Sequence, residues 1–205
     1  MKHPDVEQLK RLTLRAIVAY AVRWAQRVRP AFALSEQAQN NENCRVVDGA
    51  IAVAIAFSEG NETAADPQEA MAIAVAAASA TGNDSRCRFA ARAAALAAET
   101  LAHALGALNP SAPPDANDAA LRGDCVIDEP DDPLTLIIDC AATAAHSAAY
   151  SARFVLKEFG IDATAVDDYV TLLEQSTKQS DRIGATVDIE ALGTLWCGAP
   201  PDWRA

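Results

Sequence analysis

Long alanine-rich stretches are the feature that most constrains how this chain can fold. The stretch IDCAATAAHSAAYSARFVLKEFG, from Ile138 to Gly160, is mostly alanine with an Asp, a His, a Tyr and an Arg set into it. Alanine is the strongest helix former. Strand signals are scarce, because no two β-branched runs flank a tight Asn-Gly or Asp-Gly turn. The sequence therefore predicts an all-α fold, a compact bundle of six to seven helices.

Caps, prolines and glycines set the expected helix limits. The clearest start is at Asp66 and Pro67, where Glu69 occupies the capping-box position. A continuous first helix is expected to end at Pro30, and Gly160 is expected to stop the fifth helix. The expected helices cover roughly residues 5–28, 44–59, 67–81, 85–108, 133–159 and 162–178, with a short seventh at 189–196.

The chain reads as one domain interrupted by an acidic segment. Residues 109–133 hold five prolines together with a cluster of acids. A loop of this length is typically functional, disordered or a boundary. We expect residues 1–108 to form a four-helix N-terminal part, residues 109–133 to form an acidic Pro-rich loop, and residues 134–205 to supply the helices that complete the same domain.

Alanine helices bury little apolar surface per residue, so their axes must approach closely to gain stability. Leu or Phe at Ala52, Ala76 or Ala94 is therefore expected to overpack a helix contact and destabilise the fold by about 1–3 kcal/mol. Larger side chains recur at sparse intervals and are the expected core: Trp24, Phe32, Ile51, Ile55, Phe57, Met71, Ile73, Phe89, Leu96, Leu101, Leu136, Ile137, Phe154, Val155 and Leu172.

The net charge of −11 is unevenly distributed. Residues 1–30 carry seven Lys and Arg against two acids, whereas residues 109–205 carry six against seventeen. An acidic body lacks the clustered Lys and Arg that phosphate backbones require, which argues against nucleic acid as a direct partner. The acidity fits a basic protein partner, because complementary potentials speed encounter. It also fits a surface that is acidic for solubility alone.

The sequence offers no sign of secretion, a membrane span or a cofactor. Its five cysteines include no CxxC pair, and no apolar signal stretch follows the charged start, which predicts reduced thiols in a cytoplasmic protein. The longest uncharged stretch near the middle, residues 70–83, is shorter than the about 20 residues that cross a bilayer. The sequence motifs of a phosphate-binding loop, a dinucleotide-binding loop and a nucleophile elbow are absent, so no cofactor and no catalytic residue is expected.

Two rows of polar residues lie at helical spacing. Steps of three and four place one row on a single helix face; it consists of Asp139, Thr143, His146, Tyr150, Arg153 and Lys157. The helix before the acidic segment carries a second row, formed by Arg88, Arg92, Glu99 and His103. If the two helices are neighbours, the rows can meet or line one groove.

Three interpretations of these rows stay open at this point. Each row can be a solvated face. Alternatively, His146, Tyr150 and Arg153 belong to a recognition surface, because Tyr and Arg are favoured interface anchors. A metal-dependent enzyme is the third possibility, although no HExxH spacing is present and the sequence supports no metal site. It requires four side chains to converge: Glu99, His103, Asp139 and His146.

The stretches AVRWAQRVRPAF, residues 21–32, and CRVVDGAIAVAIAFSEG, residues 44–60, carry a family resemblance. With the alanine-laden helices that follow, they resemble an alanine-rich, all-α family of immunity proteins from bacterial polymorphic toxin systems, loosely over residues 12–160. The matching pattern is a first helix ending in Arg, an aliphatic residue, a spacer, Pro and an aromatic, then an Arg near the start of the next helix. The residues carrying it here are Trp24, Arg27, Pro30, Phe32 and Arg45.

The resemblance implies a small cytoplasmic protein that binds and neutralises a cognate toxin without catalysis of its own. The expected contact residues are Asp139, His146, Tyr150 and Arg153, with a second acidic patch formed by Asp128, Glu129, Asp131 and Asp132. Trp24 and Arg27 are also open to a plain packing and surface role. The remaining alternatives are a helical scaffold or homo-oligomer whose polar rows meet a second copy, and the metal-dependent enzyme.

Overall fold

A computed structural model of the chain shows seven α-helices and no β-strand in the part that it describes. This confirms the predicted all-α fold and the bundle architecture. The structure describes residues 3–34, 41–61, 67–80, 84–108, 133–161, 166–179, 184–196 and 202–203. The helices are α1 (Val6–Leu9), α2 (Leu14–Ala33), α3 (Asn41–Ser58), α4 (Pro67–Ser79), α5 (Ser85–Leu108), α7 (Pro133–Glu158) and α8 (Val166–Lys178).

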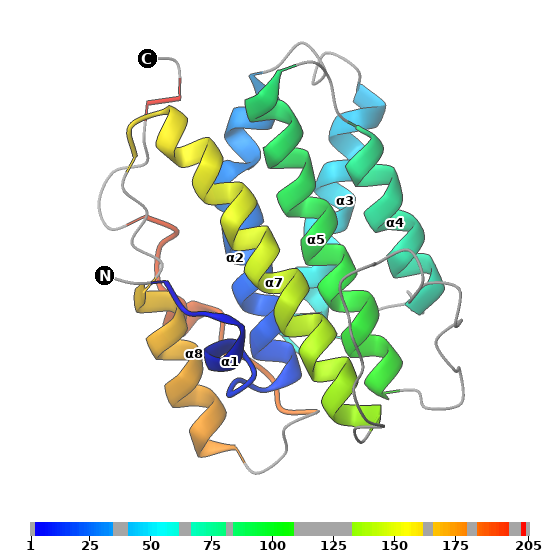
Figure 1. The fold of residues 1–205 in the computed structure, drawn as a ribbon, viewed down its shortest axis with the longest axis vertical. Helices are drawn as coiled ribbons and strands as arrows, with labels where there is room; N and C mark the ends of the chain where they lie inside the picture. Colours follow the sequence, from blue (N-terminus) through cyan, green and yellow to red (C-terminus); the bar gives the residue numbers. More distant parts are fainter. Residues whose placement is uncertain are drawn as a thin grey trace.

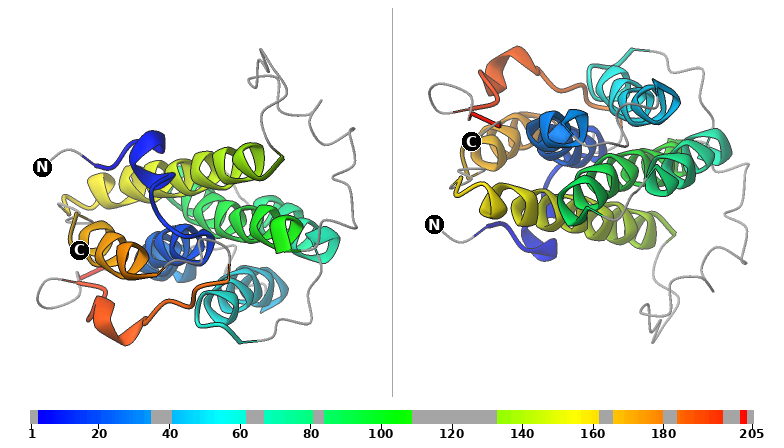
Figure 2. Two further views of the ribbon diagram at one scale, coloured as in Figure 1. Left: turned by 90° about the horizontal axis from the view of Figure 1, so that it is seen from below. Right: turned by 90° about the horizontal axis from the view of Figure 1, so that it is seen from above.

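The long helices run side by side as a bundle (Figure 1) and pack in two layers. In the views along the bundle, α7, α5 and α4 lie side by side in one layer, and α8, α2 and α3 lie in the other (Figure 2). Helix α2 packs across the layers on both α5 and α7. The short α1 lies on the outer side of α7, and the segment 184–196 runs along the outer side of the α2 layer. Helix α2 is therefore enclosed on most sides.

The expected continuous first helix is wrong, because the chain breaks between α1 and α2. Asp5 caps α1 through a capping box with Gln8. Thr13 then adopts an extended conformation and accepts a hydrogen bond from the Ala16 N–H, which starts a second helix. Apolar residues recur through the break at helical steps, so periodicity alone did not reveal it.

Pro30 does not end α2, which continues to Ala33. Proline lacks an N–H and so removes one hydrogen bond of a helix interior. Here it stands in the last turn of α2, and its own carbonyl accepts the N–H of Leu34. The predicted stop at Pro30 is therefore wrong by one turn.

Most other helix limits agree with the sequence prediction to within a few residues. Helix α5 begins at Ser85, where the Asp84 carboxylate accepts the Arg86 N–H. Helices α3 and α7 are followed by Gly60 and Gly160, which adopt positive φ angles of 85° and 67°. The expected helix at 189–196 is wrong: only a 3₁₀ turn, η2 (Glu190–Leu192), forms there, and Gly193 leaves it at a φ of 65°.

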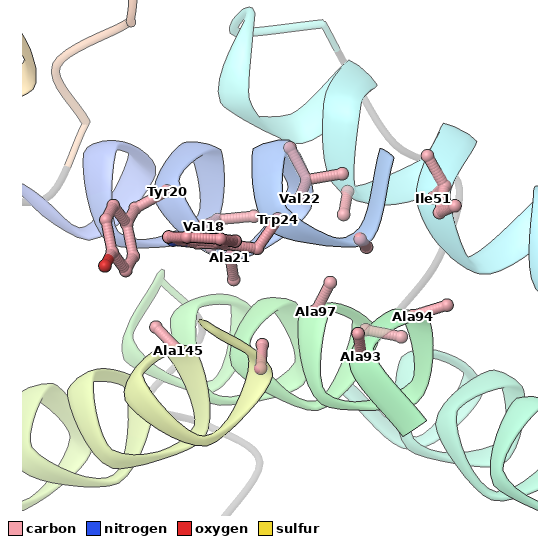
Figure 3. Close-up of a cluster of buried hydrophobic side chains, with 14 of the residues drawn as sticks. Val18, Tyr20, Ala21, Val22, Trp24, Ile51, Ala93, Ala94, Ala97 and Ala145 are labelled. Carbon is pink, nitrogen blue, oxygen red and sulfur yellow. The ribbon is translucent and has the colours of Figure 1, made fainter. Parts of the chain in front are cut away.

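Alanines fill the contacts between α2, α5 and α7. Figure 3 shows Ala97 of α5 and Ala145 of α7 on the side facing Val18 and Ala21 of α2. Nearly every alanine in these two long helices is buried: Ala90, Ala91, Ala93, Ala94, Ala95, Ala97, Ala98, Ala102 and Ala104 in α5, and Ala141, Ala142, Ala144, Ala145, Ala148, Ala149 and Ala152 in α7. Small side chains let helix axes approach closely, so this arrangement fits the expected packing.

The expected overpacking sites divide between two environments. Ala94 is 1% exposed, as expected for a helix contact. Ala52 and Ala76 lie on exposed faces of α3 and α4, so the expectation that they sit in tight contacts is wrong. Both helices pack on α5 with their other faces. An alanine can lie on either side of a helix with little effect on stability, because a single methyl group buries little apolar area.

The predicted core is correct for its largest members and misses the N-terminal apolar cluster. Buried as expected are Trp24, Phe32, Ile51, Phe57, Leu101, Val155 and Leu172. Half-buried are Ile55, Met71, Ile73, Phe89, Leu96, Leu136, Ile137 and Phe154. The fully buried residues that the prediction omitted include Leu9, Leu12, Leu14, Ile17, Tyr20 and Leu156. The core is centred on α2 rather than on α3 and α4.

The segment 184–196 is fixed to two helices. The Val187 N–H donates to the carbonyl of Ser58, the last residue of α3, at 3.1 Å. The Gln175 side chain of α8 both donates to the Asp188 carbonyl and accepts the Asp188 N–H. A side chain at Gly60 would overlap Thr186, so glycine also allows the close approach there. These contacts hold the segment across α2.

Candidate functional site

Helix α7 presents an exposed ridge formed by Thr143, Tyr150, Arg153 and Lys157. Tyr150 is 65% exposed, the largest exposed fraction among the large hydrophobic side chains that the structure describes. Directly behind it, Ala148, Ala149 and Ala152 are buried against the bundle. The ridge therefore offers an aromatic ring and two cations on a rigid helix.

The N-terminal segment covers the other end of the predicted row. Lys10 Nζ lies 2.9 Å from Asp139 Oδ1 and 2.8 Å from Glu7 Oε1. Pairing with Asp139, and then with Glu7, raises the pKa of Lys10 above its ordinary value. His146 Nδ1 lies 3.3 Å from the Pro4 carbonyl oxygen. The structure thus places Asp139 and His146 in contacts within the chain, whereas Tyr150 and Arg153 face outward.

The arrangement required by the metal-enzyme alternative is not found. Glu99 and His103 lie one turn apart on α5, with 3.7 Å between His103 Nε2 and Glu99 Oε1. Asp139 and His146 instead contact the N-terminal segment on the outer side of α7. Among the described residues, no three His, Cys, Asp or Glu side chains come together in a way that could hold a metal ion.

The residues that carry the family resemblance have mixed environments. Trp24, Arg27 and Phe32 are buried, at 0%, 5% and 0% exposure. Pro30 is half-buried in the last turn of α2, and Arg45 is exposed and paired with Glu42 on α3. The predicted acidic patch, Asp128, Glu129, Asp131 and Asp132, lies outside the described residues. Trp24, Arg27 and Phe32 therefore contribute to the fold and not to an exposed surface.

A buried charge cluster joins α2 to α8. Asp168 of α8, 4% exposed, lies 3.1 Å from Arg23 Nη2 through Oδ1 and 2.6 Å from Arg27 Nη2 through Oδ2. Two guanidinium groups thus share one carboxylate. Because buried charges require opposite charges or hydrogen bonds, the excess positive charge must be stabilised from elsewhere.

The segment 184–196 supplies part of that stabilisation through its backbone. Arg23 donates to the carbonyl oxygens of Leu192, Gly193 and Thr194 at 2.9–3.2 Å. Arg27 Nε donates to the Leu195 carbonyl at 2.9 Å. Planar guanidinium groups suit such multiple bonding. The cluster, defined as Arg23, Arg27, Asp168 and the carbonyls of residues 192–195, therefore ties three parts of the chain together.

Aromatic side chains extend the cluster toward α7. Arg27 Cζ lies 5.1 Å from the centre of the Trp24 ring, within the range of a cation–π interaction. The Tyr20 and Trp24 rings meet edge to face with their centres 6.3 Å apart, and the centre of the His3 ring lies 5.5 Å from that of the Trp24 ring. Burial raises the pKa of Tyr20 to about 12. The Tyr20 hydroxyl is therefore protonated at neutral pH.

Sequence reasoning did not identify Tyr20, Arg23 and Asp168 as a group. One signal was available: Arg23 and Arg27 stand one turn apart inside a helix that is apolar around them. Charged residues in such a position are either a solvated stripe or a buried, paired set. The partner, Asp168, is 145 positions away from Arg23, so the sequence alone could not choose between the two.

Comparisons with known proteins identify no relative. No family model matches the chain, and neither a curated protein nor a solved structure is detectably similar to it. No helix in the described part of the chain combines the length and the apolar character needed to cross a membrane.

Proposed function

We propose that the protein is a non-catalytic protein-binding module, an immunity protein that neutralises a cognate bacterial toxin by direct binding. The observation that carries the proposal is the exposed Tyr150 on the α7 ridge, with Arg153 one turn away. Tyrosine and arginine are enriched among the residues that dominate binding energy at interfaces. A rigid helix also loses little conformational entropy when a partner covers it.

The charge distribution suggests how such a partner would approach. The chain carries −11 overall, with the acids concentrated after residue 109. A basic toxin domain would be steered toward an acidic body over a distance set by the ionic strength. The ridge itself carries Arg153 and Lys157, so it suits an apolar or acidic spot within such a partner.

Co-expression with the product of the neighbouring reading frame is the direct test. Rescue of growth together with co-purification of the two proteins is the expected result. Tyr150→Ala and Arg153→Ala should each weaken co-purification without lowering the melting temperature, because both side chains are exposed. Val170→Ala and Lys178→Ala, at exposed positions of α8, are the matched controls and should bind normally.

Association kinetics test the acidic segment separately from the ridge. Reversing the charges of Asp131 and Asp132 to lysine should slow association at low salt and have little effect at high salt. An unchanged association rate at low salt would remove the acidic segment from the proposal. Full binding by both ridge variants would remove the ridge.

A second candidate, a homo-oligomer, is favoured by the outer face of α4. Val75 is 61% exposed, and Ala72 and Ala76 are exposed beside it. Exposed apolar faces with few charges commonly mark contact surfaces. Light scattering would detect a dimer whose mass does not change with dilution, and Val75→Lys should convert it to a monomer. A monomer at all concentrations would eliminate this candidate.

A further inference from the structure

Four exposed cations of α5 and α7 pair with no carboxylate in the described part of the chain: Arg88, Arg92, Arg153 and Lys157. Ion pairs with carboxylates do engage many of the other cations: Lys10, Arg23, Arg27, Arg29, Arg45 and Arg86. Acidic residues outnumber Lys and Arg by 28 to 17 in this chain. A group of cations without acids is therefore a distinct feature of this surface.

The two helix ends that carry these cations lie together. Helix α5 begins and α7 ends at the same end of the bundle (Figure 1). There the ring centres of Phe89 and Phe154 lie 4.3 Å apart across the contact between the two helices. Residues 84–92 and 150–158 together contain five Lys and Arg against two acids. This end of the two helices is therefore basic, although the chain as a whole carries −11.

Helical spacing places three of the four cations beside the aromatic pair. Arg92 stands three residues after Phe89 on α5, and residues at this spacing share a helix face. Lys157 stands three residues after Phe154 on α7 in the same way. Arg88 Cζ lies 5.6 Å from the centre of the Phe89 ring. Both rings are half-buried, so they form an apolar strip with the cations of α5 on one side and Lys157 on the other.

The grouping of these cations does not stabilise the helices. Arg88 and Arg92 stand four residues apart on α5, and Arg153 and Lys157 stand four residues apart on α7. Like charges at this spacing repel each other and weaken a helix. Two such pairs lie on neighbouring helices, and the acids of this chain lie elsewhere. Carboxylates supplied by a partner would relieve the repulsion.

The chemistry of the surface favours a protein partner over a nucleic acid. The planar group of arginine can bind a carboxylate through two parallel hydrogen bonds. Arginine and aromatic residues are also enriched in protein interfaces. A nucleic acid presents a long row of phosphates, which the excess of acids in the rest of the chain would repel. A short acidic segment of a protein would meet only the basic end of the two helices.

We propose that this surface binds an acidic segment of a partner protein. Arg88, Arg92 and Lys157 pair with carboxylates of the segment. An apolar side chain of the segment lies on the strip formed by Phe89 and Phe154. The inference rests on the proposed function in one respect, since it extends the α7 ridge onto α5 and names the chemistry of the partner that the ridge contacts.

Fluorescence anisotropy with the full chain tests the chemistry. The probe is a short labelled peptide of glutamates around a central leucine, and a peptide with glutamine in place of each glutamate is its control. The glutamate peptide should bind at low salt and lose affinity as the salt concentration rises, whereas the glutamine peptide should not bind. No binding of the glutamate peptide would overturn the proposal. Tighter binding of an oligothymidine of equal charge would overturn the choice of a protein partner.

A pair of double variants tests the location. Changing both Arg88 and Arg92 to glutamate should weaken binding of the glutamate peptide by about tenfold or more, the effect of losing two exposed ion pairs. Changing both Arg11 and Lys178 to glutamate is the matched control, because it alters the net charge equally at exposed positions outside α5 and α7 and should leave binding nearly unchanged. Equal weakening in the two double variants, or none in the first, would overturn the assignment to this surface.

Photo-crosslinking locates the peptide on the unmodified chain. A benzophenone in place of the central leucine should attach near Phe89 or Phe154, as mapped by mass spectrometry of the digested protein. Attachment confined to other helices would overturn the proposal. The result is separate from that of the toxin test: peptide binding without growth rescue would retain this surface and remove toxin neutralisation, and growth rescue without peptide binding would do the reverse.

Discussion

Helix α2 is held by two contacts of opposite chemistry. Toward α5 and α7 it meets an apolar seam, in which Ala97 and Ala145 face Val18 and Ala21 (Figure 3). Toward α8 and the segment 184–196 it meets a polar seam, the cluster of Arg23, Arg27, Asp168 and backbone carbonyls. The side chains of both seams are buried, but they hold α2 in different ways.

The difference lies in how the stabilisation is distributed. In the apolar seam it comes from many small dispersion contacts, each worth about 0.1–0.2 kcal/mol per atom pair. The seam therefore depends on the volume of each side chain. In the polar seam one carboxylate balances two cations, so the arrangement depends on a single charge. Volume changes should damage the first seam, and charge changes should damage the second.

The largest expected effect comes from removing the carboxylate of the polar seam. Asp168→Ala leaves two buried guanidinium groups without their anion and should lower the free energy of unfolding by about 3–5 kcal/mol. Chemical denaturation measures the loss. Asp168→Asn, which keeps the shape without the charge, separates the contribution of the charge from that of the side-chain volume. A cost below 1 kcal/mol for Asp168→Ala would show that the carbonyls alone hold the arginines.

Alkaline pH tests the aromatic edge of the polar seam. The pKa of Tyr20 is about 12 in the folded state and about 10 when unfolded, so the unfolded state loses its proton first as the pH rises. The contribution of Tyr20 to the free energy of unfolding is fully present below pH 10. Between pH 10 and 12 the free energy of unfolding falls progressively by about 2–3 kcal/mol. Denaturation curves across this range measure it.

Tyr20→Phe should flatten that alkaline decline, because phenylalanine has no proton to lose. Tyr150→Phe, at the exposed tyrosine of α7, is the matched control and should leave most of the decline in place. An equal decline in the Tyr20→Phe protein and the unmodified protein would mean that another group controls alkaline unfolding.

A volume change tests the apolar seam. Ala94→Leu should overpack the contacts of α5 and destabilise by about 1–3 kcal/mol, because Ala94 is 1% exposed. Ala76→Leu is the matched control on α4, where the same change points into solvent and should alter stability by less than about 0.5 kcal/mol. Similar losses at both positions would show that the buried and exposed alanines do not differ as the structure indicates.

The helices themselves were largely predictable from sequence, because their start and stop signals are local. Asp84 before α5 and Gly160 after α7 act within one turn of the helix ends that they define. The break at Thr13 was missed for the opposite reason. Its capping bond to Ala16 is local, but the apolar residues on both sides continue a helical period that hides it.

Burial was predictable for large side chains and not for alanine. Trp24 and Phe32 strongly prefer the interior, whereas Ala76 and Ala94 have the same side chain and opposite environments. The row on α7 was predictable as a shared face, since helical spacing determines it. Its partial covering by Pro4 and Lys10 was not, because such contacts depend on how distant segments fold back.

The smallest expected effect concerns an exposed ion pair of α2. Comparing it with the buried cluster shows how much burial adds to the effect of losing a carboxylate. Arg29 of α2 pairs with Asp48 of α3 through two bonds of 2.7 and 2.6 Å, in side chains 32% and 49% exposed. Water and salt screen such a pair, so Asp48→Ala should cost only about 0–1 kcal/mol. This loss should shrink further at high salt, whereas the loss from Asp168→Ala should not.

Denaturation of both variants at low and high salt measures this difference in salt sensitivity. Equal salt sensitivity would mean that water reaches Asp168, and the polar seam would then differ from the exposed pair in geometry alone.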